Sequence, residues 1–208
     1  MFTGIVAESG KVTGLDLYAD SARLTVHGPL VTAAVSPGSS IAVNGVCVTV
    51  VDVGDGHFTV DVIGETLART SLGSLASGGS VNLERPVPAD GLLDGHIVQG
   101  HVDGTGVITE TRLADGWRVL RISASPELLR YIAKKGSVAL DGVSLTVSDV
   151  SPLTGVAADD ATGWFEVSLI PETIARTTLG ASAVGDLVNI EVDVIAKYVE
   201  RLLSAGAR

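Results

Sequence analysis

The chain has 208 residues and a net charge of −10 at neutral pH, because 24 acidic residues outnumber 14 lysines and arginines. Nucleic-acid binding depends on clustered basic residues, which are lacking here, so the composition argues against that class of partner. No stretch reaches the roughly 18 uninterrupted apolar residues of a membrane span, and the N-terminus lacks the basic region of a secretory signal. The single cysteine, Cys47, excludes an internal disulfide and fits a reducing, cytoplasmic compartment.

An internal repeat organises the chain. Its unit of about 100 residues is the size of a small domain, which predicts two copies of one fold and of one pocket. We expect domains at 1–90 and 91–193, with an insertion near 151–163 that forms a surface loop in the second half. The repeated segments pair 43–50 with 140–147, 65–73 with 172–180, and 81–84 with 188–191.

Short runs rich in Val, Ile and Thr predict β-strands in both halves, with Gly, Asp, Ser and Pro between them. This spacing is typical of an all-β fold, either a small antiparallel barrel or a sandwich in each half. Proline and glycine mark a linker at 86–95, and Ser125-Pro126 favours a short helix over 127–135. The predicted strands are 23–26, 40–51, 57–63, 117–122, 137–147 and 164–170.

The C-terminal tail lies outside the repeat and has helical periodicity. Ile195, Val199 and Leu202 fall at i, i+4 and i+7 on one face of a predicted helix over 194–203. A helix this short needs a surface to pack on. The mean hydropathy of +0.42 is high for a small chain, so we expect apolar surface to be buried between subunits.

Cys47 and Ser144 occupy equivalent positions in the repeat, and each is followed two residues later by a threonine, Thr49 or Thr146. A free cysteine is more often a small buried hydrophobe than a reactive group. The repetition favours the alternative, a wall of small polar side chains that face a ligand on one side of a strand. A nucleophilic cysteine needs a base or a cationic neighbour, and none is adjacent in the sequence.

His96 and His101 are too far apart on a strand or helix to share a metal, and no further Cys or His completes a zinc site, so no metal is expected. With the halves aligned at an offset of 97, His101 falls opposite Gly4. It is then either a proton carrier found in one half only or a structural histidine. Asp193 takes the place of Pro86, and serves either as a cap or in a role that differs between the two sites.

Six motifs together resemble the riboflavin synthase alpha-chain family over nearly the whole length. The resemblance implies two six-stranded antiparallel Greek-key barrels, a C-terminal helix at 194–208, and a homotrimer whose active sites lie between subunits. It implies a cofactor-independent dismutation of two 6,7-dimethyl-8-ribityllumazine molecules into riboflavin and 5-amino-6-(D-ribitylamino)uracil. An association with lumazine synthase is left open. The motifs are 1–6, 44–50, 95–102, 141–147, 170–173 and 188–191.

The same resemblance implies the residues of two facing pockets. The N-terminal pocket is lined by Phe2, Thr3, Gly4, Ile5, Val6, Cys47, Val48, Thr49, Asp61, Val62, Ile63, Gly64, Glu65 and Thr66. The C-terminal pocket is lined by Gly100, His101, Val102, Lys135, Ser144, Leu145, Thr146, Ser168, Leu169, Ile170, Pro171, Glu172 and Thr173. Polar roles near the reacting centres fall to Cys47, His101, Ser144, Thr146 and Asp193, with the base unassigned.

Two other functions compete with this interpretation. One is a non-catalytic protein that binds lumazine or flavin as a fluorescent accessory; the small polar residues kept in both copies, and His101, favour the enzyme. The other is a generic interaction module, which leaves the near-identity of 65–73 and 172–180 unexplained.

Overall fold

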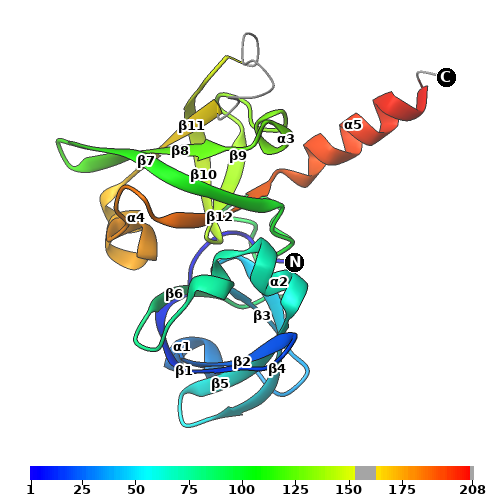
Figure 1. The fold of residues 1–208 in the computed structure, drawn as a ribbon, viewed down its shortest axis with the longest axis vertical. Coiled ribbons are helices and arrows are strands. Elements are labelled where there is room, and N and C mark those ends of the chain that lie inside the picture. The colour runs from blue at the N-terminus through cyan, green and yellow to red at the C-terminus, as the bar shows by residue number, and fades with distance from the viewer. Residues whose placement is uncertain (153–162, 207–208) are drawn as a thin grey trace.

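The computed structural model describes residues 1–152 and 163–206. Within them, each half of the chain forms one closed antiparallel barrel of six strands, and a helix follows the second barrel (Figure 1). The predicted fold class is therefore confirmed. The predicted insertion falls mainly on 153–162, outside the described residues. Among the described residues, no helix combines the length and apolar character needed to cross a membrane.

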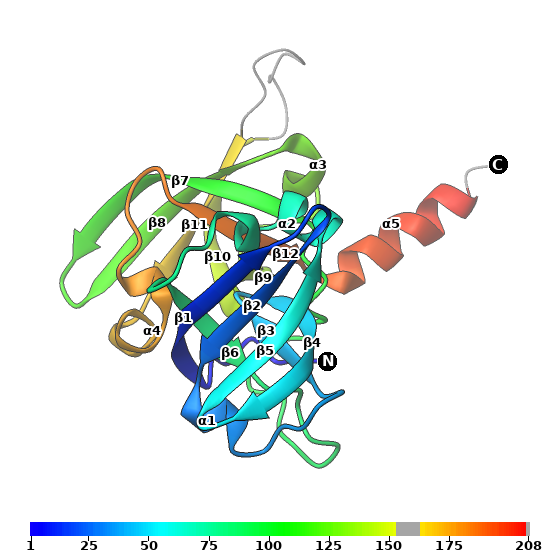
Figure 2. The ribbon, with the colours of Figure 1, turned by 60° about the horizontal axis from the view of Figure 1, so that its bottom comes forward.

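The N-terminal barrel has the strand order β1-β2-β5-β4-β3-β6, and Figure 2 shows several of these strands side by side. Two short helices and a 3-10 turn cover its ends. The strands are β1 (Glu8–Leu17), β2 (Ser21–His27), β3 (Ser40–Val43), β4 (Val46–Gly54), β5 (His57–Ile63) and β6 (Ser80–Glu84). The helical elements are α1 (Pro29–Thr32), α2 (Gly64–Arg69) and η1 (Ser71–Ser74).

The C-terminal barrel repeats this connectivity element by element, in the order β7-β8-β11-β10-β9-β12 around its closed circle. Its strands are β7 (Gly104–Ala114), β8 (Trp117–Ala124), β9 (Ser137–Leu140), β10 (Val143–Val150), β11 (Gly163–Leu169) and β12 (Leu187–Val192). Its helical elements are α3 (Pro126–Leu129), α4 (Pro171–Arg176) and η2 (Thr178–Gly180).

Two predicted strands are in fact hairpins. Residues 40–51 and 137–147 were each predicted as one strand, but each turns back at a two-residue loop, Asn44-Gly45 or Asp141-Gly142. All four turn residues have positive φ, the conformation that Asn-Gly and Asp-Gly adopt in the tightest hairpins. Apolar residues stand on both sides of each turn, so the turn was not recognised in the sequence. The predicted helix over 127–135 is only α3, and Ser125 does not cap it with its side chain.

The structure has three apolar cores. Each barrel encloses its own core, which is built from the inward-facing, alternate residues of its strands. The core of the first barrel includes Phe58, and that of the second includes Phe165. Burying one such aromatic ring contributes about 1.5–3 kcal/mol. A third, small core lies between the barrels and consists of Phe2, Ala42, Val98 and Ala139. The two barrels therefore pack directly against each other.

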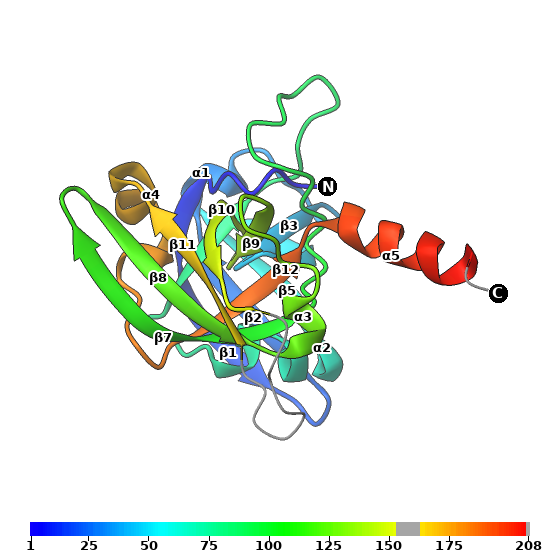
Figure 3. The ribbon, with the colours of Figure 1, turned by 90° about the horizontal axis from the view of Figure 1, so that it is seen from above.

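The predicted C-terminal helix is present as α5 (Val194–Gly206), which projects away from the barrels (Figure 1). Lys197 pairs with Asp103 at 2.5 Å, and Glu200 contacts Arg130 and the Tyr131 hydroxyl, so the first turns are tied to the second barrel. The predicted boundary between residues 90 and 91 falls in the 85–103 connection, part of which loops out from the body (Figure 3).

Candidate active site

The two halves meet at the turns that close the β3–β4 and β9–β10 hairpins. Nδ2 of Asn82 donates to the carbonyl of Asp141 at 3.0 Å, and Nδ2 of Asn189 donates to the carbonyl of Asn44 at 2.8 Å. The glycines of the two turns lie so close that a Cβ on either would come within 2.7 Å of the other's backbone nitrogen. The contacts obey an approximate two-fold relation, so the repeat in the sequence is also a symmetry of the junction.

A short segment ahead of each barrel's first strand crosses this junction. Phe2 and Val98 pair as an isolated antiparallel bridge where the segments pass each other. Beyond the bridge, Val6 packs against the core of the C-terminal barrel, and Val102 packs against the core of the N-terminal barrel. Each barrel is thus completed by a segment that leads into the strands of the other.

A glycine in each crossing segment makes the contact with the opposite barrel. The carbonyl of Gly4 accepts a hydrogen bond from the backbone N–H of Ser144 at 2.8 Å, and that of Gly100 accepts one from Cys47 at 2.9 Å. Both glycines have φ near +80°, and a Cβ at either would lie 2.5–2.6 Å from the Cβ of its partner. Only glycine permits both this backbone conformation and this close approach.

A buried glutamate holds each crossing segment in place. The carboxylate of Glu84 accepts hydrogen bonds from the backbone N–H of Thr3 at 2.7 Å and of Gly4 at 3.0 Å. The carboxylate of Glu191 accepts the equivalent bonds from Gln99 at 2.6 Å and Gly100 at 2.9 Å. Burial raises the pKa of both carboxyl groups, and the hydrogen bonds oppose that rise.

The cavity beside Cys47 brings together predicted residues from both halves of the sequence. It has a volume of about 330 Å³, which suits a small organic ligand. One wall comes from β4 and α2, and the other from the crossing segment before β7. Its lining residues are Val46, Cys47, Glu65, Thr66, Arg69, Thr70, Gly100, His101 and Val102. The side chain of His101 is exposed to solvent at this cavity.

Ser144 has a different neighbour from Cys47. Its Oγ lies 2.7 Å from Nδ1 of His96, a buried imidazole whose Nε2 has no hydrogen-bond partner among the described residues. Burial lowers the pKa of His96, and the nearby charge of Asp193 opposes this effect. A neutral imidazole with Nδ1 unprotonated accepts the serine proton and makes Oγ a better base or nucleophile. Asp193 also caps α5, with Oδ1 3.0 Å from the N–H of Ile195.

The structure corrects the alignment of the two halves at their beginnings. The matched contacts pair Gly4 with Gly100, an offset of 96, so His101 corresponds to Ile5 and not to Gly4. The offset becomes 97 only at α1 and α3, where Pro29 matches Pro126. His101 remains an imidazole without a counterpart, as predicted, but it replaces an aliphatic side chain.

The structure also corrects the assignment of the crossing segments to pockets. Gly4, Ile5 and Val6 were predicted for the N-terminal pocket, yet their segment contacts Ser144 and the C-terminal core. Residues 100–102 were predicted for the C-terminal pocket, yet they line the cavity beside Cys47 in the N-terminal barrel. Sequence position suggested the wrong barrel because the segments exchange over the junction.

Several other predicted residues do not point toward a cavity. The side chains of Val48, Val62, Leu145 and Leu169 lie inside the barrels, because strand residues alternate between faces. Asp61 is paired with Arg23 at 2.8 Å on the barrel surface, and Arg23 lowers the pKa of Asp61. The predicted residues that are exposed and do not line the cavity beside Cys47 are Thr49, Ile63, Lys135, Thr146, Ile170, Pro171 and Glu172. Gly64, Ser168 and Thr173 are half-buried, whereas Phe2 and Thr3 are buried at the junction.

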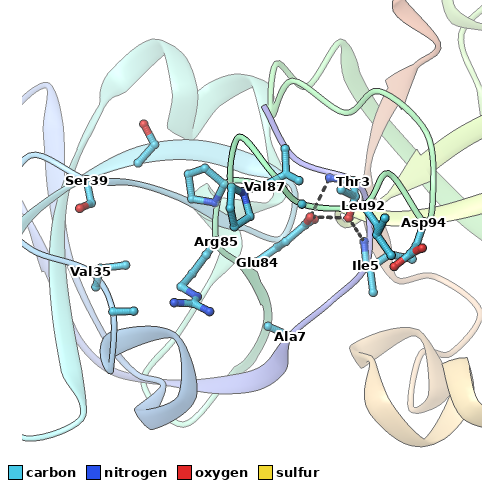
Figure 4. Close-up of a pocket in the computed structure, with 15 residues that line it drawn as sticks. Thr3, Ile5, Ala7, Val35, Ser39, Glu84, Arg85, Val87, Leu92 and Asp94 are labelled. Carbon is cyan, nitrogen blue, oxygen red and sulfur yellow. Dashed lines mark hydrogen bonds between the residues drawn. The ribbon is translucent and has the colours of Figure 1, made fainter.

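A larger cavity, of about 600 Å³, lies elsewhere (Figure 4). It is bounded by the loop after α1, the 85–94 connection and the segment before β1, and shares only Thr3 and Ile5 with the predicted set. Its buried carboxylate, Glu84, is already engaged by backbone N–H groups. We therefore place the candidate sites at Cys47 and Ser144. No group of three metal-ligating side chains occurs in the residues that the structure covers.

Comparison with known proteins identifies the family. The model of the lumazine binding domain matches the chain twice, over residues 3–86 and 99–193. The chain belongs to the lumazine-binding family. It is 56% identical to the riboflavin synthase of Mycobacterium tuberculosis H37Rv over 208 residues, covering 99% of this chain and 100% of that protein. It is 47% identical to the riboflavin synthase of Actinobacillus pleuropneumoniae over 203 residues, covering 98% and 90%.

Solved structures share the fold. The crystal structure of LumP complexed with 6,7-dimethyl-8-(1'-D-ribityl) lumazine matches with a TM-score of 0.80 and 23% identity, over 92% of this chain and 99% of that one. The complex of LumP with riboflavin matches with a TM-score of 0.81 at 24% identity over the same shares. These likenesses establish the arrangement of the two barrels.

Sequence reasoning missed three residues that shape the sites. His96 was considered only as a metal ligand, although its position beside a motif shared with His101 was visible in the sequence. Glu84 and Glu191 end the repeated Val-Asn-hydrophobic-Glu segments. An acidic residue repeated after an apolar one near both strand ends was the signal in the sequence that could have pointed to them. Their partners lie about 80 to 90 residues away in sequence, so the pairing became visible only in the fold.

Proposed function

We propose that this protein catalyses the riboflavin synthase reaction, the dismutation of two molecules of 6,7-dimethyl-8-ribityllumazine. One lumazine gives a four-carbon unit to the other, and the products are riboflavin and 5-amino-6-(ribitylamino)uracil. The observation that carries this proposal is the pair of matched sites around Cys47 and Ser144. A reaction between two identical molecules needs two similar binding sites, and the repeated fold supplies them. The 56% identity to a riboflavin synthase over the full chain supports the same reaction.

The differences between the two sites support unlike roles in the reaction. The chemistry needs a proton to leave the acidic 7-methyl group of one lumazine and a nucleophile to add to the other. The Ser144 site has a buried imidazole, His96, 2.7 Å from the hydroxyl, which is suited to proton transfer at neutral pH. The Cys47 site has His101 at its rim. We propose that these groups, with Asp193 near His96, carry the proton transfers.

We further propose a cytoplasmic homotrimer in which the Cys47 site of one subunit faces the Ser144 site of the next. The apolar side chains on α5 support an oligomer: Leu202 is 73% exposed and Val199 is 50% exposed in the single chain. Holding two substrates face to face between subunits lowers the barrier by several kcal/mol through proximity. We also propose lumazine synthase as a partner, because it would supply the substrate directly.

The test is incubation of the purified protein with 6,7-dimethyl-8-ribityllumazine alone, followed by absorbance and chromatography. We expect riboflavin and the aminouracil to form in equal amounts without any added cofactor. The second candidate function is non-catalytic lumazine binding, which the fold shared with LumP favours. Tight binding of the lumazine with no riboflavin over hours would establish that candidate and overturn the enzyme.

A further inference from the structure

We infer that Glu84 and Glu191 are positioning residues, each serving the ligand site of the barrel opposite its own. Glu191 is the penultimate residue of β12 in the C-terminal barrel, but the segment that it holds completes the cavity beside Cys47. Glu84 ends β6 of the N-terminal barrel, but the segment that it holds contacts Ser144. This inference rests on the proposed function, because it concerns how the same two sites are assembled.

The chemistry of the hydrogen bonds requires a carboxylate at these positions. Both oxygens of Glu191 accept a backbone N–H, from Gln99 at 2.6 Å and from Gly100 at 2.9 Å. An amide side chain has only one accepting oxygen, so its NH₂ group would face one of these N–H donors. Hydrogen bonds to a charged acceptor are roughly twice as strong as those between neutral groups. Glutamine at this position therefore loses one bond and gains a repulsive contact.

The segment that Glu191 holds continues directly into the wall of the cavity. The carbonyl of Gly100 accepts the N–H of Cys47, and the next two residues, His101 and Val102, form one wall of the cavity. The glutamate and the cysteine backbone hold the segment from opposite sides. Loss of the glutamate bonds leaves Gly100 attached on one side only, so the wall is expected to open.

The repeat supplies the matched control. Glu84 is 7% exposed and Glu191 is 4% exposed, and each accepts hydrogen bonds from two consecutive N–H groups, the second of which belongs to a positive-φ glycine. The same substitution at either position therefore disturbs the same pair of backbone bonds at a similar depth, and at Glu84 it also affects the bond from the Thr3 hydroxyl. A general loss of stability would affect both variants alike. A positioning role predicts that each variant disturbs only the site across the junction.

Cys47 provides a reporter that does not depend on activity. It is the only cysteine of the chain and lines the cavity that Glu191 is inferred to hold closed. The rate of its alkylation by iodoacetamide is measured for the full-length parent, Glu191→Gln, Glu84→Gln and the exposed control Glu127→Gln. We expect Glu191→Gln to react at least about fivefold faster, as local opening becomes easier. Glu84→Gln and Glu127→Gln should stay within about twofold of the parent.

Ligand binding gives the second measurement. Added 6,7-dimethyl-8-ribityllumazine should protect Cys47 in the parent and in Glu84→Gln, whereas protection of Glu191→Gln should need at least about tenfold more ligand. In turnover assays, Glu191→Gln should raise KM because it weakens a binding wall, and should also lower kcat because the same wall carries His101, whereas Glu127→Gln should change neither. Equal labelling of Glu84→Gln and Glu191→Gln, or parent-like labelling of Glu191→Gln, would overturn the inference.

Two controls separate other causes of failure. If Glu191→Gln does not fold, Gly100→Ala tests the same wall, because its Cβ would lie 2.6 Å from the Cβ of Cys47; faster alkylation supports the inference and an unchanged rate contradicts it. If the parent forms no riboflavin, the proposed function fails. The alkylation rates without ligand then still decide whether Glu191 positions the segment beside Cys47.

Discussion

At the scale of single residues, three differences between the two halves lie at the candidate sites or at the junction between the barrels. When the halves are aligned, Cys47 corresponds to Ser144, Ile5 corresponds to His101, and Asn44 corresponds to Asp141. The first two differences alter the chemistry of a site, and the third places an ionisable group in a buried position. These positions therefore offer the most direct tests by substitution.

His101→Gln should affect turnover more than binding. The imidazole lies at the rim of the Cys47 cavity, and proton transfer by a positioned histidine typically contributes about 10²–10⁴ in rate. Glutamine keeps some hydrogen bonding but does not titrate. We expect kcat to fall at least tenfold, with dissociation constants changed less than about threefold. Steady-state kinetics and fluorescence titration measure both. Full turnover with an unchanged pH–rate profile would leave His96 and Ser144 as the proton carriers.

Asp141→Asn should stabilise the protein at high pH. Burial raises the pKa of Asp141 to about 7 from an ordinary value of 3.8. The folded state therefore binds this proton more tightly than the unfolded state, and stability falls as pH rises from about 4 to about 7. Asparagine, which already occupies the equivalent position 44, removes that loss. The gain at pH 8 is at most about 4 kcal/mol, from 1.36 kcal/mol per pKa unit.

Urea unfolding at pH 4.5 and pH 8 tests this expectation. The difference between parent and Asp141→Asn should be large at pH 8 and should fall to about a quarter of that value at pH 4.5, where the folded state keeps the proton. Asn44→Asp introduces a carboxyl group at the equivalent buried turn, so it should destabilise the protein at pH 8. Identical unfolding curves for parent and Asp141→Asn at pH 8 would contradict the raised pKa of the buried Asp141 carboxyl group.

At the scale of secondary-structure elements, α5 combines two kinds of contact. Its polar side binds its own barrel through Lys197 and Glu200. Its apolar side, with Ile195, Val199 and Leu202, remains exposed in the single chain. An apolar helix face of this size is unusual on the surface of a monomer. The helix is therefore tied to its own barrel on one side and leaves its apolar face exposed, where the proposed trimer would bury it.

A double substitution, Val199→Glu with Leu202→Glu, should convert the oligomer to monomers. Two charges on the apolar face cost far more to bury than the aliphatic side chains that they replace, while the contacts of Lys197 and Glu200 remain. Monomers should bind lumazine but lose most turnover, because in the proposed trimer the facing site belongs to another subunit. Sedimentation velocity and riboflavin formation measure the two effects.

Ser204→Glu is the control for the α5 experiment. With about 100° of rotation per residue, position 204 lies on the side of the helix opposite Ile195, so this added charge should leave the oligomer intact. An oligomer that persists in the double variant would show that the principal contact between subunits lies on the barrels.

At the scale of the whole molecule, the sequence was sufficient for the architecture but not for the assembly of the sites. The repeat and the short apolar runs predicted two similar β-domains, and the helical spacing of apolar residues in the tail predicted the terminal helix, because all three can be read directly from the sequence. The hairpin turns at Asn44 and Asp141 were missed because apolar residues flank them closely. The exchange of the crossing segments, and the contact of His96 with Ser144, depend on how the barrels face each other. No local pattern encodes that arrangement.

Two ligand sites per chain should be found at saturation. Cys47 and Ser144 occupy equivalent positions in the two barrels, so each chain should bind two molecules of lumazine or riboflavin with unequal affinity. Isothermal titration calorimetry of the full-length protein with riboflavin, which does not turn over, gives the number directly. A single site per chain at saturating riboflavin would mean that one barrel no longer binds.

The exchange of crossing segments has a consequence for the evolution of the chain. After a gene is duplicated, the two copies usually diverge freely, because each keeps its own function within its own sequence. Here each site combines residues encoded in both copies, so a substitution in either copy is subject to selection through two sites. Neither half can be deleted, shuffled or replaced by an unrelated domain without removing a wall of the other half's site. The two halves are therefore inherited as a single functional unit.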